Sequence, residues 1–443
     1  MSSRLPKINH ALRTDVGRKR LANEDALSSD PRLNLFVVCD GIGGRPSGEA
    51  ASQIIAHTYA HALRRRLRGL PRLDEATLKW LLVDAAVDMN QQMFEHAQAV
   101  PALLGMGCTL VSALIEAHKL FYLHAGDSRL YLLRDQQLRQ LTADHVHTRP
   151  QYKTRPDTGD RIDAGERRLL MQYIGSPDPL QPSVASHDLQ PGDRLLLCSD
   201  GLTDPVSDDI LQRILTTYPD PDDAATVLIK AANAGGGPYN ITVAVLDYQG
   251  HRPATAEDRK LPPRGKRQLP HGIAEQTRLA LDQLEQDLLW LQQGARETAH
   301  PRRLTALAAA KRRLGPTAYR EFLEHDPDQP PSHVFHRCCT APDSAWRQRY
   351  HPHLQQLEIP LQQITAGNVR LSPVLTAQQT AAIFGDLWKG WRRVEQRYFA
   401  TTQRDADTHS PVTSNDLIDH MLHSVQTLAG LLWFLPRFMR EKN

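Results

Sequence analysis

Two aspartates stand where a run of apolar residues ends in an Asp-Gly pair, and both are candidate metal ligands. Asp40 follows the segment 37–39, and Asp200 follows the segment 195–199. A run of this kind predicts a buried strand, and the glycine allows a sharp turn after it. Two such strands could meet and hold a hard divalent cation through carboxylate oxygens. For either aspartate alone, the alternative is ordinary turn chemistry.

Arg20 and Glu24 suggest what such a cation would do. They lie four residues apart, so alternation along a strand would place both side chains on one face. That face would present a phosphate-binding group beside a metal-binding group. The alternative is that Arg20, in the short basic run 18–20, belongs to an ordinary solvated surface.

Asp127 is a third acidic candidate. It lies in the sequence Gly-Asp-Ser-Arg, between the strand-like segments 120–124 and 130–133. A carboxylate in this tight passage between two strands could join the other two at a metal site. The alternative is that Asp127 only caps a turn.

Seven short motifs, in this order, resemble those of the metal-dependent protein phosphatase 2C family of serine/threonine phosphatases in its bacterial form. The resemblance covers about residues 8–248 and depends on the joint order of the motifs, because no single one is specific. The motifs are residues 20–25, 40–44, 107–110, 125–129, 141–145, 192–194 with 199–204, and 240–243.

The resemblance implies a metal centre of two Mn²⁺ or Mg²⁺ ions bridged by Asp40. The Gly41 carbonyl and Glu24, acting through a water molecule, would bind one ion, and Asp200 would bind the other. Asp127 together with Asp200 would hold a third, weaker ion.

The resemblance also implies the reaction. Arg20 would bind the substrate phosphate. A water between two cations has a lowered pKa and would attack phosphorus in line, while the cations offset charge on the phosphoryl oxygens. No covalent phospho-enzyme would form. The expected function is hydrolysis of phosphoserine and phosphothreonine in a phosphorylated protein substrate, in opposition to a bacterial Ser/Thr kinase.

One residue departs from the family pattern. The last motif of the family contains an aspartate that binds the same ion as Asp200, and this chain has Tyr239 in its place. Tyrosine ionises only at about pH 10 and is a poor ligand for a hard cation. The alternative function is therefore a weakly active or inactive phosphatase-fold protein that serves in binding or as a scaffold. Asp204 could compensate, since it lies four residues after Asp200.

The expected fold is α+β, with two packed antiparallel sheets flanked by helices and followed by an all-α accessory region. Residues 48–67 and 76–99 have the periodicity of long amphipathic helices, and the apolar runs bounded by glycine predict antiparallel strands. Residues 145–180 are polar and basic, which predicts a solvated loop. By the resemblance this region would be a mobile flap beside the metal site.

Length and charge predict two domains in this chain of 443 residues. Residues 1–249 contain 27 Lys+Arg against 30 Asp+Glu, whereas the remainder contains 26 against 20. The proline-rich, basic segment 250–272 is typical of an extended linker. Residues 273–443 predict a helical accessory domain. Its helix-like stretches are 279–291, 304–314, 346–364, 378–398 and 417–439.

The helical region predicts a docking or autoregulatory role. It could hold a partner kinase or scaffold near the active site, or cover the flap. The histidines and cysteines of 333–339 and 351–353 match no established zinc spacing, so we expect ordinary core and surface residues there. A modest positive charge without interleaved stacking aromatics disfavours nucleic acid as a partner.

The cysteines and the apolar segments bear on location. Five cysteines without a regular framework predict a reducing compartment, with Cys39, Cys108 and Cys198 buried as small apolar residues. Residues 1–9 lack the apolar core of a signal peptide, and no apolar stretch reaches the roughly 20 residues that cross a bilayer. We expect a soluble cytoplasmic protein that does not associate with a membrane.

Overall fold

The computed structural model describes residues 4–42, 46–67, 74–154, 161–253, 271–298, 345–368, 371, 374–401 and 414–438. Contacts divide the chain into two compact units. The first comprises Met1–Gly44, Gly48–Ala99 and Gly105–Pro263. The second comprises Arg45–Ser47, Val100–Leu104 and Arg264–Asn443.

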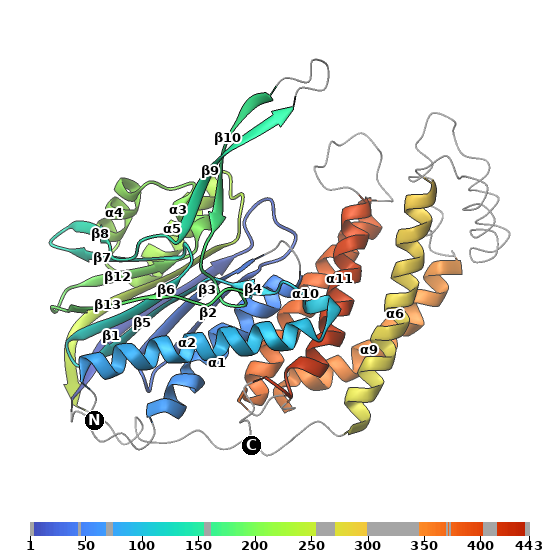
Figure 1. Ribbon diagram of the computed structural model, residues 1–443, viewed down its shortest axis with the longest axis horizontal. Coiled ribbons are helices and arrows are strands. Elements are labelled where there is room, and N and C mark those ends of the chain that lie inside the picture. Colours follow the sequence, from blue (N-terminus) through green and yellow to red (C-terminus); the bar gives the residue numbers. More distant parts are fainter. Residues whose placement is uncertain are drawn as a thin grey trace. The chain divides into compact units, whose positions relative to one another are not determined.

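The first unit contains two antiparallel sheets and a separate hairpin (Figure 1). One sheet has the order β1 (Arg4–Asp15), β13 (Ile241–Pro253), β12 (Arg194–Cys198), β7 (Arg129–Arg134) and β8 (Gln137–Gln140). The other has the order β11 (Ser183–Asp188), β6 (Lys119–Ala125), β5 (Leu110–Glu116), β3 (Leu35–Ile42) and β2 (Asp25–Asp30), with β4 (Gly107–Cys108) paired to β3. The hairpin joins β9 (Val146–Thr154) to β10 (Arg161–Leu170).

The two sheets bury a shared apolar core because alternate side chains of each strand point inward. Phe36 and Val38 on β3 lie in the same buried cluster as Leu195 and Leu197 on β12. The intervening Leu196 belongs to a second cluster on the other face of β12. This arrangement confirms the predicted α+β fold with two packed antiparallel sheets.

Two helix pairs accompany the sheets. The predicted helices of residues 48–67 and 76–99 are confirmed as α1 (Pro46–Leu67) and α2 (Glu75–Gln98). The Asp74 carboxylate accepts the N–H of Thr77 at 2.7 Å and so caps the first turn of α2. The apolar faces of α4 (Asp208–Thr217) and α5 (Pro221–Ala234) pack on the outer face of the β12 sheet.

Two local predictions are wrong. Residues 16–24 form no strand but a turn-containing connection between β1 and β2, so strand alternation does not explain how Arg20 and Glu24 come together. The basic region that was expected to be a solvated loop contains the β9–β10 hairpin, which projects from the rest of the unit in Figure 1. The hairpin forms because the backbones of two adjacent chain segments pair, and a polar composition alone does not exclude such strand pairing.

The described part of the second unit is helical, as predicted. Its elements are α6 (His271–Thr298), α9 (Ala345–Gln363), the short η3 (Ile364–Asn368), α10 (Ala377–Thr401) and α11 (Ser414–Phe434). The predicted helix 304–314 and the histidine and cysteine residues of 333–339 lie outside the described residues. His353 pairs with the buried Asp287 at 2.9 Å, and His351 accepts the Arg347 Nε–H at 3.0 Å.

Two further expectations concern cysteines and membranes. Cys39, Cys108 and Cys198 are free and buried, as predicted, and burial raises the pKa of the Cys39 and Cys198 thiols. Among the helices of the described ranges, none combines the length and the apolar character needed to cross a bilayer.

Candidate active site

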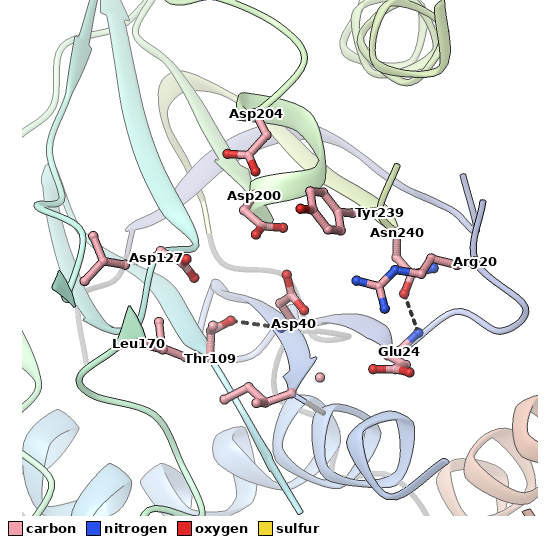
Figure 2. A pocket seen from close by; sticks show the side chains of 13 residues that line it. Arg20, Glu24, Asp40, Thr109, Asp127, Leu170, Asp200, Asp204, Tyr239 and Asn240 are labelled. Carbon is pink, nitrogen blue, oxygen red and sulfur yellow. Dashed lines mark hydrogen bonds between the residues drawn. The ribbon is translucent and has the colours of Figure 1, made fainter. Parts of the chain in front are cut away.

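An open pocket of about 490 Å³ brings all seven predicted site residues together (Figure 2). The predicted residues that line it are Arg20, Glu24, Asp40, Gly41, Asp127, Asp200 and Tyr239. Asp204, which was expected to be able to compensate for Tyr239, also lines the pocket. The remaining lining residues were assigned no role from the sequence, namely Ile42, Thr109, Val146, Leu170 and Asn240.

Asp40 lies near the end of β3, and Thr109 fixes its backbone. The Thr109 hydroxyl accepts the Asp40 N–H at 2.9 Å, and the Asp40 carbonyl accepts the Thr109 N–H at 2.8 Å. The same hydroxyl is 2.7 Å from the Ser128 Oγ, next to Asp127. Thr109 thereby connects the positions of two candidate ligands, a role that only its place in the motif 107–110 could have suggested.

Asp200 begins the short helix α3 (Asp200–Thr203) directly after β12. The preceding Ser199 hydroxyl donates to the Asp25 carboxylate at 2.7 Å and accepts the Thr242 N–H at 3.0 Å. Asp25 is only 2 % exposed and stands opposite Asp40 in the β2–β3 ladder. Asp25 is therefore a buried acidic neighbour of the site that the sequence did not single out.

Burial and the neighbouring negative charges change the pKa values of these carboxyl groups. Burial, followed by the negative charges of Asp25, Asp200 and Asp127, raises the pKa of Asp40 well above its usual range. Burial, followed by the charges of Asp127, Asp204 and Asp25, raises the pKa of Asp200 to about 7. Burial also raises the pKa of Asp25 to about 6. Without a cation, the surroundings of Asp25, Asp40 and Asp200 thus favour the protonated form of each more than water does.

The donor set suits a hard divalent cation. It consists of carboxylate oxygens, and the Asp25 Oδ1 is buried with no hydrogen-bond partner among the described residues. No three described His, Cys, Asp or Glu side chains are close enough to enclose one ion by themselves. An ion there would therefore complete its coordination with main-chain carbonyl oxygens and water, which is usual for Mg²⁺ and suits Mn²⁺.

Gly41 and Glu24 form one wall of the pocket. The Gly41 N–H donates to the Glu24 carbonyl at 3.0 Å. A Cβ at Gly41 would lie 2.5 Å from the Gly48 carbonyl oxygen and 2.6 Å from that of Glu24, so no larger residue fits. Glu24 is 7 % exposed, and the Ser52 hydroxyl donates to its carbonyl at 2.5 Å.

Asn240 holds the connection between β1 and β2, which includes Arg20. Its Oδ1 accepts the Glu24 N–H at 2.9 Å. Its Nδ2 donates to the carbonyls of Val16 at 2.9 Å and Ala22 at 2.8 Å. Because these partners are more than 200 positions away in the sequence, no local pattern predicts the role of Asn240.

Arg20 and Tyr239 lie on the side of the pocket away from Asp127 in Figure 2. Arg20 is exposed, and its guanidinium carbon lies 5.2 Å from the centroid of the Tyr239 ring. Asp204 follows α3 and extends toward Asp200 in the same view. Val146 and Leu170, at the base of the β9–β10 hairpin, line the pocket, whereas the basic side chains farther along the hairpin lie outside the described residues.

Comparisons with known proteins find phosphatase sequences and structures that are similar to this chain. A family model described as protein phosphatase 2C matches residues 16–228. The serine/threonine phosphatase stp of Listeria welshimeri is 32% identical over 239 residues, which are 53% of this chain and 94% of that protein. The serine/threonine protein phosphatase PstP of Mycobacterium tuberculosis is 36% identical over 242 residues, or 54% of this chain. The match spans only 45% of the length of PstP.

A crystal structure of the catalytic domain of PstP with two manganese ions is 33% identical. It covers 55% of this chain and 100% of that one, with a TM-score of 0.43. From the sequence matches, the chain belongs to the protein phosphatase 2C family. Its first unit contains a domain of the serine/threonine protein phosphatase class.

Replacing Asn240 with alanine should destabilise the first unit by about 3 kcal/mol. The change removes three hydrogen bonds and leaves buried backbone groups without partners. Urea unfolding of the full chain measures the effect. The exposed Asn9 on β1 provides the control, because Asn9→Ala should change stability by less than about 0.5 kcal/mol. Equal effects of the two substitutions would contradict the assigned role of Asn240.

Replacing Asp200 with asparagine should stabilise the metal-free protein, and more so at about pH 7.5 than at about pH 5. The raised pKa of Asp200 means that its contribution to stability is lost as pH rises from about 4 through about 7, when it ionises in the native state. Thermal unfolding in the presence of a chelator measures the difference between the native chain and the variant.

Buried histidines change stability in the opposite direction over this range, since burial lowers the pKa of His124 and His145. The comparison of Asp200→Asn with the native chain cancels that contribution. A stabilisation that is the same at both pH values would show that Asp200 is not a destabilising buried carboxylate.

Proposed function

We propose that this protein hydrolyses phosphoserine and phosphothreonine side chains of phosphorylated proteins by means of a metal-activated water. The single observation that supports this function best is the pocket itself. The half-buried Asp40 and Asp200 line it together with Asp127, and so does the exposed Arg20. A phosphate monoester needs both a cation-binding surface and an anion-binding group, and both occur here.

The residues present fit two Mn²⁺ or Mg²⁺ ions. Asp40 would bind both, with Asp200 on one ion and the Gly41 carbonyl, together with Glu24 through water, on the other. Asp127 with Asp200 would hold a third ion. The oxygen donors of the pocket support this arrangement of ions. The raised pKa values of Asp40 and Asp200 also support it, because bound cations would offset the burial and the repulsion that raise these pKa values.

The protein groups have separate tasks in the reaction. The ions, when bound, lower the pKa of a coordinated water and offset charge on the phosphoryl oxygens. Arg20 binds the phosphate through its planar fork of N–H donors and orients it in the pocket. Thr109 and Ser199 keep Asp40 and Asp25 in place through their hydrogen bonds.

No cysteine among the described residues suits attack on phosphorus. The described cysteines are buried, and the raised pKa values of the Cys39 and Cys198 thiols keep these two protonated. Attack by water, without a covalent phospho-enzyme, is the route that this pocket favours.

The alternative function was an inactive or weakly active binding protein, suggested by Tyr239. The comparisons give it no support, since the relatives are named as phosphatases. Asp204 also lines the pocket, and its negative charge contributes to the raised pKa of Asp200. We therefore infer that Asp204 supplies part of the negative charge that Tyr239 lacks.

We further infer the organisation of the chain and its setting. Residues 1–249 would form the catalytic domain, 250–272 a linker, and 273–443 an accessory domain that docks a Ser/Thr kinase or a scaffold. The helical character of the described tail supports an accessory role. The free, buried cysteines agree with a reducing, cytoplasmic location.

Hydrolysis of a phosphothreonine peptide should require Mn²⁺ or Mg²⁺ and should fall at least about 100-fold in Asp40→Asn. The matched control is Asp209→Asn, an exposed aspartate in the first turn of α4, which should leave the rate unchanged. Mn²⁺ should also raise the melting temperature of the native chain more than that of Asp40→Asn. Full activity in a chelator would overturn the metal-dependent function.

Removing residues 260–443 should lower activity on the native phosphoprotein substrate but leave hydrolysis of a short phosphopeptide unchanged. The reason is that docking raises the effective concentration of a large substrate without changing the chemistry. Steady-state kinetics on both substrates measure the difference. Identical activity of the full and shortened chains on the phosphoprotein would count against the docking role.

A further inference from the structure

The guanidinium of Arg20 rests on the ring of Tyr239. Its central carbon is 5.2 Å from the ring centroid, within the range of a cation–π interaction. Arg20 is exposed, whereas Tyr239 is half-buried and lines the pocket. An exposed arginine samples many rotamers, and a fixed aromatic face beneath it restricts them.

Two close approaches constrain the backbone from which this ring projects. Gly17 has φ +78°, and a Cβ there would lie 2.1 Å from the Tyr239 carbonyl oxygen. A Cβ at Gly201 would lie 1.8 Å from the Asn240 carbonyl oxygen. Tyr239 therefore belongs to a backbone segment that is pressed against both the connection that includes Arg20 and the helix that begins at Asp200.

The backbone of the Arg20 connection is held independently of the Tyr239 side chain. The Arg18 N–H donates to the Gly237 carbonyl at 2.8 Å. The Asn240 side chain bonds to Val16 and Ala22 on either side of Arg20. The Tyr239 ring can thus act on the Arg20 side chain alone, and its removal leaves these backbone bonds in place.

We propose that Tyr239 is a positioning residue, whose ring holds the Arg20 guanidinium ready to bind the phosphoryl group of the substrate. This inference rests on the proposed phosphatase function and assigns a task to the residue that replaces an acidic ligand. A tyrosine side chain is a poor ligand for a hard cation. Its ring face attracts the guanidinium, so less rotamer freedom is lost when phosphate binds.

A double-mutant cycle on Arg20 and Tyr239 tests the proposal. Tyr239→Leu should raise KM for a phosphothreonine peptide about fivefold and change kcat by less than about twofold. Tyr239→Phe, which keeps the ring, should remain within about twofold of the native chain in both constants. In the Arg20→Ala background, Tyr239→Leu should have no further effect, because the ring then has nothing to hold.

The Mn²⁺ concentration for half-maximal activity is measured in the same variants and should be unchanged by Tyr239→Leu. The controls are Tyr218→Leu, at a tyrosine that is 36% exposed and not among the pocket residues, and Lys19→Ala, beside Arg20. Both should leave KM unchanged. Melting temperatures identify any variant that loses its fold. If Tyr239→Leu does so, the comparison of Tyr239→Phe with the native chain still separates the effect of the ring from that of the hydroxyl.

Three results would overturn the proposal. Additive effects of Tyr239→Leu and Arg20→Ala would show that the ring does not act through the arginine. Equal losses in Tyr239→Phe and Tyr239→Leu would assign the effect to the hydroxyl. A changed Mn²⁺ requirement with unchanged KM would place the ring's task at the metal site.

Calorimetric binding of the phosphothreonine peptide in Mn²⁺ separates this proposal from the proposed function. If the native chain binds the peptide without hydrolysing it, the same cycle in Kd supports the positioning role while the phosphatase function fails. If the native chain hydrolyses the peptide but the cycle is additive, the function stands and the positioning role fails.

Discussion

The desolvation and close spacing of a cluster of carboxyl groups is the constraint on which the rest of this structure depends. Asp25 is buried, Asp40 and Asp200 are half-buried, and each of the three has a raised pKa. Burying like charges together is costly unless a counter-charge compensates them. If the pocket binds divalent cations, as we propose, it loses stability in the metal-free state in exchange for affinity toward those cations.

The fold opposes this repulsion with a rigid frame. Asp40 lies near the end of β3 and Asp200 directly follows β12, and the core shared by the two sheets holds these strands in place. Neutral hydrogen-bonding residues then fix each acid without adding charge. Thr109 holds the backbone of Asp40, and Ser199 binds the Asp25 carboxylate.

The sequence predicted the groups with local signatures. An apolar run before Asp-Gly identified Asp40 and Asp200, and helical periodicity identified α1, α2 and most of the described tail helices. Thr109 and Asn240 escaped notice because their hydrogen-bond partners are distant in the sequence. Asp25 lies in the motif 20–25 but received no metal-site role from the sequence, because only the pairing of β2 with β3 places it opposite Asp40. The β9–β10 hairpin was missed because polar composition does not reveal strand pairing.

Under this proposal, Tyr239 has a different task from that of an acidic ligand at the same position. A carboxylate there would strengthen cation binding, whereas the tyrosine ring supports Arg20 and leaves cation binding to the remaining acids. Two different interactions then act in the pocket. Charge neutralisation acts at Asp40 and Asp200, and aromatic packing acts at Arg20.

Proton release on Mn²⁺ binding tests the central claim most directly. Calorimetric titration at about pH 6, in two buffers with different ionisation enthalpies, counts the protons that are displaced. Carboxyl groups with raised pKa values must ionise to bind cations, so the account predicts saturable Mn²⁺ binding with net proton release, and loss of that release in Asp40→Asn. Mn²⁺ binding without proton release, or no binding at all, would contradict the account.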